Sequence, residues 1–203
     1  MDTTQQRTAR GIAAFRNVFT FAVLAHVADV ITTHWRAPSL ADEGNVMYLF
    51  LVRHGFAGWP ALICIKVVVV GALAFAYSWY LGVREQYVPT QRITSFRGLI
   101  WYSMWDGRDY PHGLLARIFN LREITFGAMI VAAIALPASA VAAVYYSVDN
   151  AFWAMRHPLP SFALPIFVVL VTPMMFVWWC LAYRQFAEEH RQMESAADAT
   201  DGD

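Results

Sequence analysis

Residues 19–35 read FTFAVLAHVADVITTHW, and this stretch decides the fold. It is apolar enough to cross a bilayer, yet Asp29 lies inside it. A carboxylate in a transmembrane helix costs a few kcal/mol or more, so it is usually paired or functional. The next apolar run, residues 62–70, carries Lys66 in the same way. We therefore expect a membrane protein whose chemistry centres on Asp29 and Lys66.

The composition of the whole chain agrees with this interpretation. Of its 203 residues, 58% are hydrophobic and only 15% are charged, whereas a soluble domain has about 25% charged residues. Helices are the default spanning element because lipid cannot satisfy free backbone N–H and C=O groups, and the short alternating segments of a barrel are not seen. The net charge is zero, which gives no nucleic-acid footprint. The sequence predicts an all-α, polytopic membrane protein.

The apolar runs place four spans of about the 20 residues that a bilayer requires. They cover residues 15–34, 59–83, 124–146 and 162–183 of a single integral-membrane domain. Eleven arginines fall in the two tails and the central loop, while only Arg36, Arg53 and Arg156 lie on the other side. The positive-inside rule then predicts that both termini are cytoplasmic.

The segments between and after the spans have patterns of their own. Residues 40–54 predict a short re-entrant or outer interfacial helix, too short to span, which Gly55 ends in a left-handed cap. The loop 84–123 predicts an amphipathic helix in the inner headgroup region, with a soluble partner-facing loop as the alternative. The tail 192–203 is acidic and polar, which predicts disorder in the isolated protein.

The third span has small residues at a helical spacing that allows close helix packing. They are Ala128, Ala132, Ala135, Ser139 and Ala143. The expected packing partner is either the first helix of this chain or another protein.

A polar stripe runs along the first span. His26, Asp29, Thr33 and Arg36 recur at helical spacing, and the cost of a polar stripe in lipid predicts that it faces inward. Asp29 lies about 8 Å below the outer end of its helix and Lys66 about 10 Å below the same surface, at 1.5 Å per residue. The two opposite charges are thus at matching depth on consecutive antiparallel helices. We predict an ion pair between them.

The same residues carry a resemblance to a known family. The pattern is Asp29-x-x-Thr32-Thr33, then Glu43-x-Asn45, then Gly55, Gly58 and Lys66. It resembles the DUF5658 family of small prokaryotic integral membrane proteins of unknown function, over residues 19–80. Val46 stands where a proline is expected. The resemblance implies one polar cluster of Asp29, Thr33, Glu43, Asn45 and Lys66, in a prokaryotic inner membrane of the cell or an intracytoplasmic one.

Two interpretations of this cluster, which includes His26, stay open. In the first it is an internal polar staple, with Glu43 and Asn45 pinning the short helix. In the second it is a site for an ion, a proton or a small polar solute. The histidines and carboxylates form no metal-binding pattern, and no nucleophile motif occurs, so we predict no metal site and no catalytic residues. His26 is the one histidine well inside a predicted span, which argues against a bis-histidine haem.

Three functions of different class follow. The first is a non-catalytic accessory or structural subunit of a larger membrane complex, such as a respiratory or photosynthetic energy-converting assembly. The second is a small oligomeric transporter of ions, protons or solutes that uses the Asp29–Lys66 cluster. The third is an intramembrane metal-dependent enzyme. For the first, which we expect, the partners are the lipid bilayer and other membrane-protein subunits; no cofactor is predicted, with room left for a bound lipid or pigment.

Overall fold

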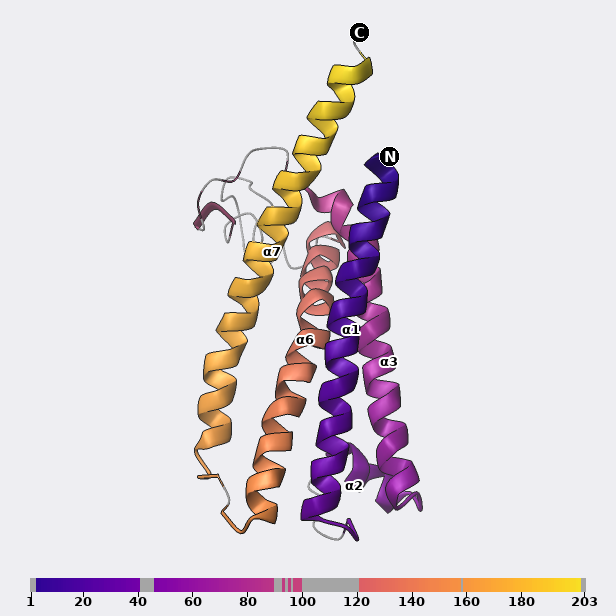
Figure 1. Cartoon of the computed structure of the whole chain (residues 1–203), viewed down its shortest axis with the longest axis vertical. Coiled ribbons are helices and arrows are strands. Elements are labelled where there is room, and N and C mark those ends of the chain that lie inside the picture. The colour runs from indigo at the N-terminus through magenta and orange to yellow at the C-terminus, as the bar shows by residue number, and fades with distance from the viewer. Residues whose placement is uncertain are drawn as a thin grey trace. The chain divides into compact units, whose positions relative to one another are not determined.

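The structure, a computed structural model, describes residues 3–40, 46–89, 93, 95, 97–99, 121–157 and 159–201. Its elements are α1 (Thr3–Arg36), α2 (Val46–Arg53), α3 (Trp59–Val83), the 3-10 helix η1 (Arg84–Tyr87), α6 (Leu121–Ala154) and α7 (Ala163–Asp201) (Figure 1). Every regular element among the described residues is a helix, which confirms the all-α prediction.

Among the described residues, four stretches are long and apolar enough to cross a membrane. They are Arg10–Arg36, Trp59–Tyr87, Ile124–Ala154 and Ala163–Ala196. The best window of the first has a mean hydropathy of 1.4, against 2.2 in the other three. The polar side chains of the stripe on α1 account for part of this lower value. The prediction of four helices long and apolar enough to span a membrane is therefore confirmed, and these helices are consistent with a multi-pass membrane protein.

The third span was predicted to end at Tyr146, and the helix that contains it, α6, continues to Ala154. The helix ends where Arg156 adopts a left-handed φ of 63°. The N–H of Arg156 bonds to the carbonyl of Trp153 at 2.9 Å, and that of His157 to Phe152 at 2.9 Å. This pair of bonds is a Schellman cap, which usually has glycine in the left-handed position. An arginine there gave no signal in the sequence.

Of the short helix predicted over residues 40–54, the structure describes α2 at Val46–Arg53. Leu40 has a positive φ of 56° and precedes the helix, and residues 41–45 lie outside the described part of the chain. The predicted glycine cap is confirmed, since Gly55 has a φ of 86° and its N–H bonds to Val52 at 3.1 Å. The re-entrant placement of α2 stays a prediction.

The acidic tail does not match its prediction of disorder, because α7 is helical through Asp201. Alanine, glutamate, glutamine and methionine are strong helix formers and dominate the stretch 187–197. Ion pairs one turn apart, such as Arg184 with Glu188 at 3.2 Å, support the preceding turns. Most of the predicted loop helix within 84–123 lies outside the described residues, apart from η1 at its start.

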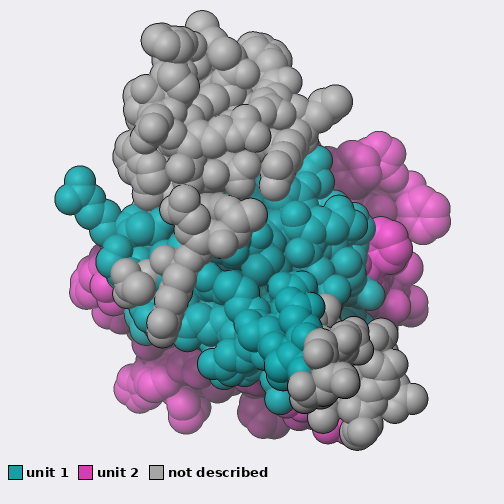
Figure 2. All heavy atoms as spheres, turned by 90° about the horizontal axis from the view of Figure 1, so that it is seen from above, with its two compact units in different colours: residues 1–15, 77–134, 173–203 teal, residues 16–76, 135–172 magenta. Residues whose placement is uncertain are grey.

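The chain divides into two compact units, coloured separately in Figure 2. Unit 1 comprises residues 1–15, 77–134 and 173–203, and unit 2 comprises 16–76 and 135–172. The long helices α1, α3 and α6 each contribute one part to each unit, and so does α7.

Unit 1 is packed around aromatic side chains. Trp179 and Tyr183 of α7 are fully buried and stack with ring centroids 5.2 Å apart. Phe126 of α6 lies edge-on, 6.4 Å from each of them. The Tyr183 hydroxyl donates a hydrogen bond to the carbonyl of Tyr87 in η1, and the guanidinium of Arg84 lies 4.0 Å from the centre of the Phe186 ring.

Unit 2 contains the short helix and the start of α3. Leu40, Tyr48, Leu62 and Ile65 form a buried apolar cluster that joins α2 to α3. Two hydrogen bonds fix the connection: the Gly58 N–H donates to the Tyr48 hydroxyl at 3.2 Å, and the Trp59 indole donates to Pro38 at 3.0 Å. Tyr48 is buried and Trp59 is partly buried, and the polar atom of each aromatic side chain has a hydrogen-bond partner.

Candidate functional site

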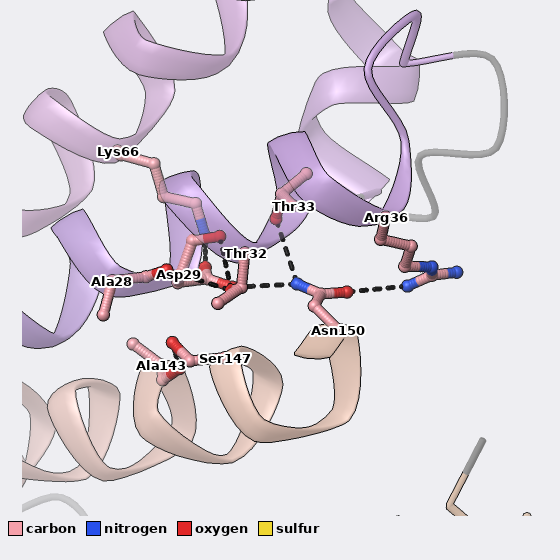
Figure 3. Close-up of polar contacts among 9 residues, drawn as sticks. All are labelled: Ala28, Asp29, Thr32, Thr33, Arg36, Lys66, Ala143, Ser147 and Asn150. Carbon is pink, nitrogen blue, oxygen red and sulfur yellow. Dashed lines mark hydrogen bonds and ion pairs between the residues drawn. The ribbon is translucent and has the colours of Figure 1, made fainter. Parts of the chain in front are cut away.

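The candidate site is a buried polar cluster in unit 2, shown in Figure 3. Three helices supply its side chains. The side chains are Asp29, Thr32, Thr33 and Arg36 from α1, Lys66 from α3, and Ser147 and Asn150 from α6. Helical spacing places Asp29, Thr33 and Arg36 on one face of α1, as the sequence predicts.

The predicted ion pair between Asp29 and Lys66 is present. Lys66 Nζ lies 2.5 Å from Asp29 Oδ2, and the two side chains are 20% and 5% exposed. In hydrocarbon neither charge has water to replace its partner. The two helices are thus connected by the ion pair that the sequence predicts.

Asn150 extends the cluster to α6. Its amide nitrogen donates to Thr33 Oγ1 at 3.0 Å and to Asp29 Oδ1 at 3.4 Å, and its amide oxygen accepts from Arg36 Nη1 at 3.0 Å. Guanidinium nitrogens only donate, so the amide oxygen must face Arg36 and the amide nitrogen must face Asp29. One buried amide therefore links a carboxylate on one side to a cation on the other.

The remaining hydroxyl groups are satisfied within their own helices. The Thr32 hydroxyl donates to the backbone carbonyl of Ala28 at 2.9 Å and makes a longer contact, 3.2 Å, with the backbone carbonyl of Asp29. Ser147 donates to the carbonyl of Ala143 at 2.7 Å. Such back-bonding lets a hydroxyl enter a membrane helix without a partner on another helix. These two hydroxyl groups do not extend the network between the helices.

Arg36 closes the cluster at the end of α1. Its guanidinium lies over the Trp153 ring, 5.3 Å from the centroid, besides its bond to Asn150. A guanidinium held against an aromatic face and a neutral amide keeps its charge while it is partly removed from water. The end of α1 is thereby attached to the last turns of α6.

His26 does not join the cluster, which corrects part of the predicted stripe. Both ring nitrogens are buried, and neither has a hydrogen-bond partner among the described residues. The ring instead lines a groove between α1 and α3. Glu43 and Asn45, the other two predicted members, lie outside the described residues.

The small residues of α6 are only partly where the sequence predicts. Ala132 and Ala143 are buried, Ala135 and Ser139 are half-buried, and Ala128 is exposed. The buried line within unit 2 is offset from them, at Leu136, Ala140, Ala143, Ser147 and Asn150. Its alternating spacing of four and three residues leads directly to Asn150, which the sequence analysis missed.

Metal ligands do not gather in the described part of the chain. No group of three histidine, cysteine, aspartate or glutamate side chains comes close enough to hold an ion there. His54 contacts the backbone carbonyl of Phe50 at 2.8 Å, and His34 packs edge-on against Trp59. These two histidines therefore contribute to the packing of the α2 region.

In comparisons with known proteins, the chain matches no family model, no curated protein and no solved structure. The resemblance of residues 19–80 to the DUF5658 family stays a prediction.

Proposed function

We propose that this protein is a non-catalytic structural subunit of a larger membrane assembly, of the energy-converting kind. The observation that carries the proposal is the closure of the polar cluster. Each carboxylate oxygen of Asp29 already has a partner from this chain, Lys66 for one and Asn150 for the other. A site for catalysis or transport keeps a polar group available to its substrate. In a structural cluster, the polar groups instead bond to one another and hold the helices together.

The energetics of the cluster support the same role. Breaking a buried ion pair by removing one partner costs about 3–5 kcal/mol, because the other charge is left uncompensated. Hydrogen bonds between membrane helices contribute about 0.6 kcal/mol on average. The Asp29–Lys66 pair is therefore the strongest single tie available between α1 and α3, and Asn150 extends it to α6.

The outer surfaces of the helices support a role in an assembly. Only 11% of the apolar window of α7 is buried within the protein, and Val168 and Val169 are 51% and 70% exposed. Neither of the apolar stretches 124–146 and 163–183 contains a charged residue. Such faces suit contact with lipid tails or with the apolar helices of other subunits. In the proposal, unit 2 keeps its own helices in register while these faces meet neighbours.

The proposed location is a prokaryotic inner membrane with both termini in the cytoplasm. The support is the arginine distribution, with eleven of fourteen arginines in the tails and the central loop. Asp29, Lys66 and Asn150 then lie toward the outer side.

A transporter that uses the same cluster is the competing function. It requires an ion or proton to displace Lys66 or Asn150 from Asp29 in each cycle. The structural role requires instead that these contacts persist. Neutral replacements for Asp29 and Lys66 therefore separate the two functions. They would abolish transport in the transporter, whereas the structural subunit would still assemble.

Native mass spectrometry of the protein, solubilised from its own membrane in mild detergent, tests the proposal. We expect a complex of constant stoichiometry with at least one different subunit. A matched sample with Asp29→Asn and Lys66→Met together should still form that complex, because no charge is left unpaired. Isolation as a monomer or as a symmetric homo-oligomer alone would contradict the proposal.

A further inference from the structure

The short helix α2 has two apolar sides, and only one of them is covered by this chain. Tyr48 and Leu51 belong to the apolar cluster that joins α2 to α3. The side chains on the other side, together with one just after the helix, are large, apolar and 40–63% exposed. They are Leu49, Phe50, Val52 and Phe56, and we call them the α2 face. An exposed apolar patch of this kind usually marks a contact surface.

The position of α2 limits what can cover this face. The helix lies in the connection between Arg36, where α1 ends, and Trp59, where α3 begins (Figure 1). Both neighbours are long and apolar enough to span a membrane. The Trp59 indole donates a hydrogen bond to the carbonyl of Pro38 at 3.0 Å, and tryptophans with a bonded indole at the end of a span are typical of the membrane interface. The α2 helix is therefore level with the boundary between headgroups and acyl chains.

The last turn of α2 satisfies its own backbone carbonyls. The N–H of Gly55 bonds to the Val52 carbonyl at 3.1 Å, and that of Phe56 to the Leu51 carbonyl at 2.9 Å. Nδ1 of His54 lies 2.8 Å from the Phe50 carbonyl, and since a carbonyl only accepts, Nδ1 must donate. Carbonyls at the end of a helix otherwise bond to water, which hydrocarbon does not provide. This end of α2 is suited to surroundings with little water.

The charge at the end of α2 distinguishes a lipid surface from an apolar protein partner. Arg53 is exposed and has no carboxylate partner among the described residues. Residues 46–58 contain no acidic side chain. An arginine beside an apolar face can lay its stem on acyl chains and bring its guanidinium to a phosphate, which it binds with two parallel hydrogen bonds. An apolar helix of another protein would leave this charge without a partner.

We propose that the α2 face inserts into the acyl chains of the adjacent leaflet, with Arg53 bound to lipid phosphate. At eight residues, α2 is about 12 Å long, much less than the roughly 30 Å of a hydrocarbon core. It lies along the surface, immersed by about 5–10 Å as amphipathic interfacial helices are. The contact anchors the connection between α1 and α3 in the bilayer. It requires only this chain and phospholipid, so it is independent of the proposed function.

Spin labels on the α2 face test the proposal directly. The full chain, with any subunits that purify with it, is reconstituted in vesicles of phosphatidylcholine and phosphatidylglycerol. Cys64→Ala and Cys180→Ala remove the native thiols, and Phe50→Cys or Phe56→Cys then carries a nitroxide. Electron paramagnetic resonance measures how often the label collides with oxygen, which concentrates in lipid, and with a nickel chelate, which stays in water.

Two further labels give the lipid and water references. Val68→Cys lies at an exposed position within the apolar run of α3, and Asp198→Cys at an exposed position in the polar end of α7. We expect oxygen collisions to exceed nickel collisions severalfold at Phe50→Cys and Phe56→Cys, as at Val68→Cys, and the reverse at Asp198→Cys. If one α2 variant fails to fold, the other decides.

Two results would overturn the insertion of the α2 face. Collisions mainly with nickel, as at Asp198→Cys, would place the face in water. Few collisions with either reagent would show that protein covers it, either a partner subunit or a second copy of the chain.

A charge reversal tests the contact of Arg53 with phosphate. Arg53→Glu should raise the nickel collision rate of the label at Phe56→Cys about twofold or more, because repulsion from the phosphates lifts the face toward water. Arg156→Glu is the matched control, with the same change in the exposed connection after α6, and should leave that rate unchanged. Equal rates in the two variants would overturn the phosphate contact.

Discussion

Unit 1 and unit 2 are stabilised by different kinds of contact. In unit 1, Trp179 stacks on Tyr183 and Phe126 lies edge-on to Trp179. The stabilisation therefore comes from many small dispersion contacts. In unit 2, a few directional contacts connect Asp29, Lys66 and Asn150. Lipid tails are as apolar as the aromatic rings, so aromatic packing discriminates weakly between neighbours in a membrane. A buried ion pair discriminates strongly, because either charge alone is costly.

This comparison predicts that unit 2 is sensitive to single substitutions at its charges. Lys66→Met should lower the free energy of unfolding by about 3–5 kcal/mol, because the Asp29 carboxylate is left buried without a cation. Reversible unfolding in mixed micelles measures this change. Val67→Met, one residue along α3 and 66% exposed, is the control and should be close to neutral. A neutral result for Lys66→Met would remove the distinction between the units.

The next effect concerns the link to α6. Asn150→Leu keeps the number and branching of the side-chain heavy atoms but removes the bonds to Asp29, Thr33 and Arg36, and we expect a loss of about 1–3 kcal/mol. The same unfolding assay applies. The exposed neighbour Val148→Leu should change little. Equal stability of the two variants would mean that α6 is held by its small-residue packing alone.

The smallest of these effects lies in unit 1. Tyr183→Phe removes one hydroxyl bond to the Tyr87 carbonyl and keeps the stacked ring, so the expected loss is about 1 kcal/mol. Tyr146→Phe, at a ring 44% exposed, is the control. If Tyr183→Phe destabilised the protein as much as Lys66→Met, unit 1 would depend on a single polar contact just as unit 2 does.

Some of this organisation was predictable from the sequence. Long uncharged runs determine the spans because lipid cannot satisfy an unpaired backbone. Depth also follows from the rise per residue, so the pairing of Asp29 with Lys66 could be predicted. The direction in which each side chain of α1 faces was harder to predict from the sequence. His26 lies one turn before Asp29 on α1, yet it faces the groove, because lateral packing and not spacing alone determines which side chains meet.

The missed residue, Asn150, shows a different limit. The third span was predicted to end at Tyr146, which placed Asn150 in the connection that follows it. In the structure Arg156 provides the left-handed cap, and the helix continues past Asn150. The spacing of Leu136, Ala140, Ala143 and Ser147 was a usable signal. Extended by three residues, it identifies Asn150 as the next inward position.

We infer that Asp29 and Lys66 act as one internal unit. A double-mutant cycle with Asp29→Asn and Lys66→Met, followed by reversible unfolding, tests it most directly. We predict that the double variant loses less stability than the sum of the single variants, with a coupling of about 2 kcal/mol or more. Losses that add to within about 0.5 kcal/mol would contradict the claim and show that the two charges stabilise the protein independently.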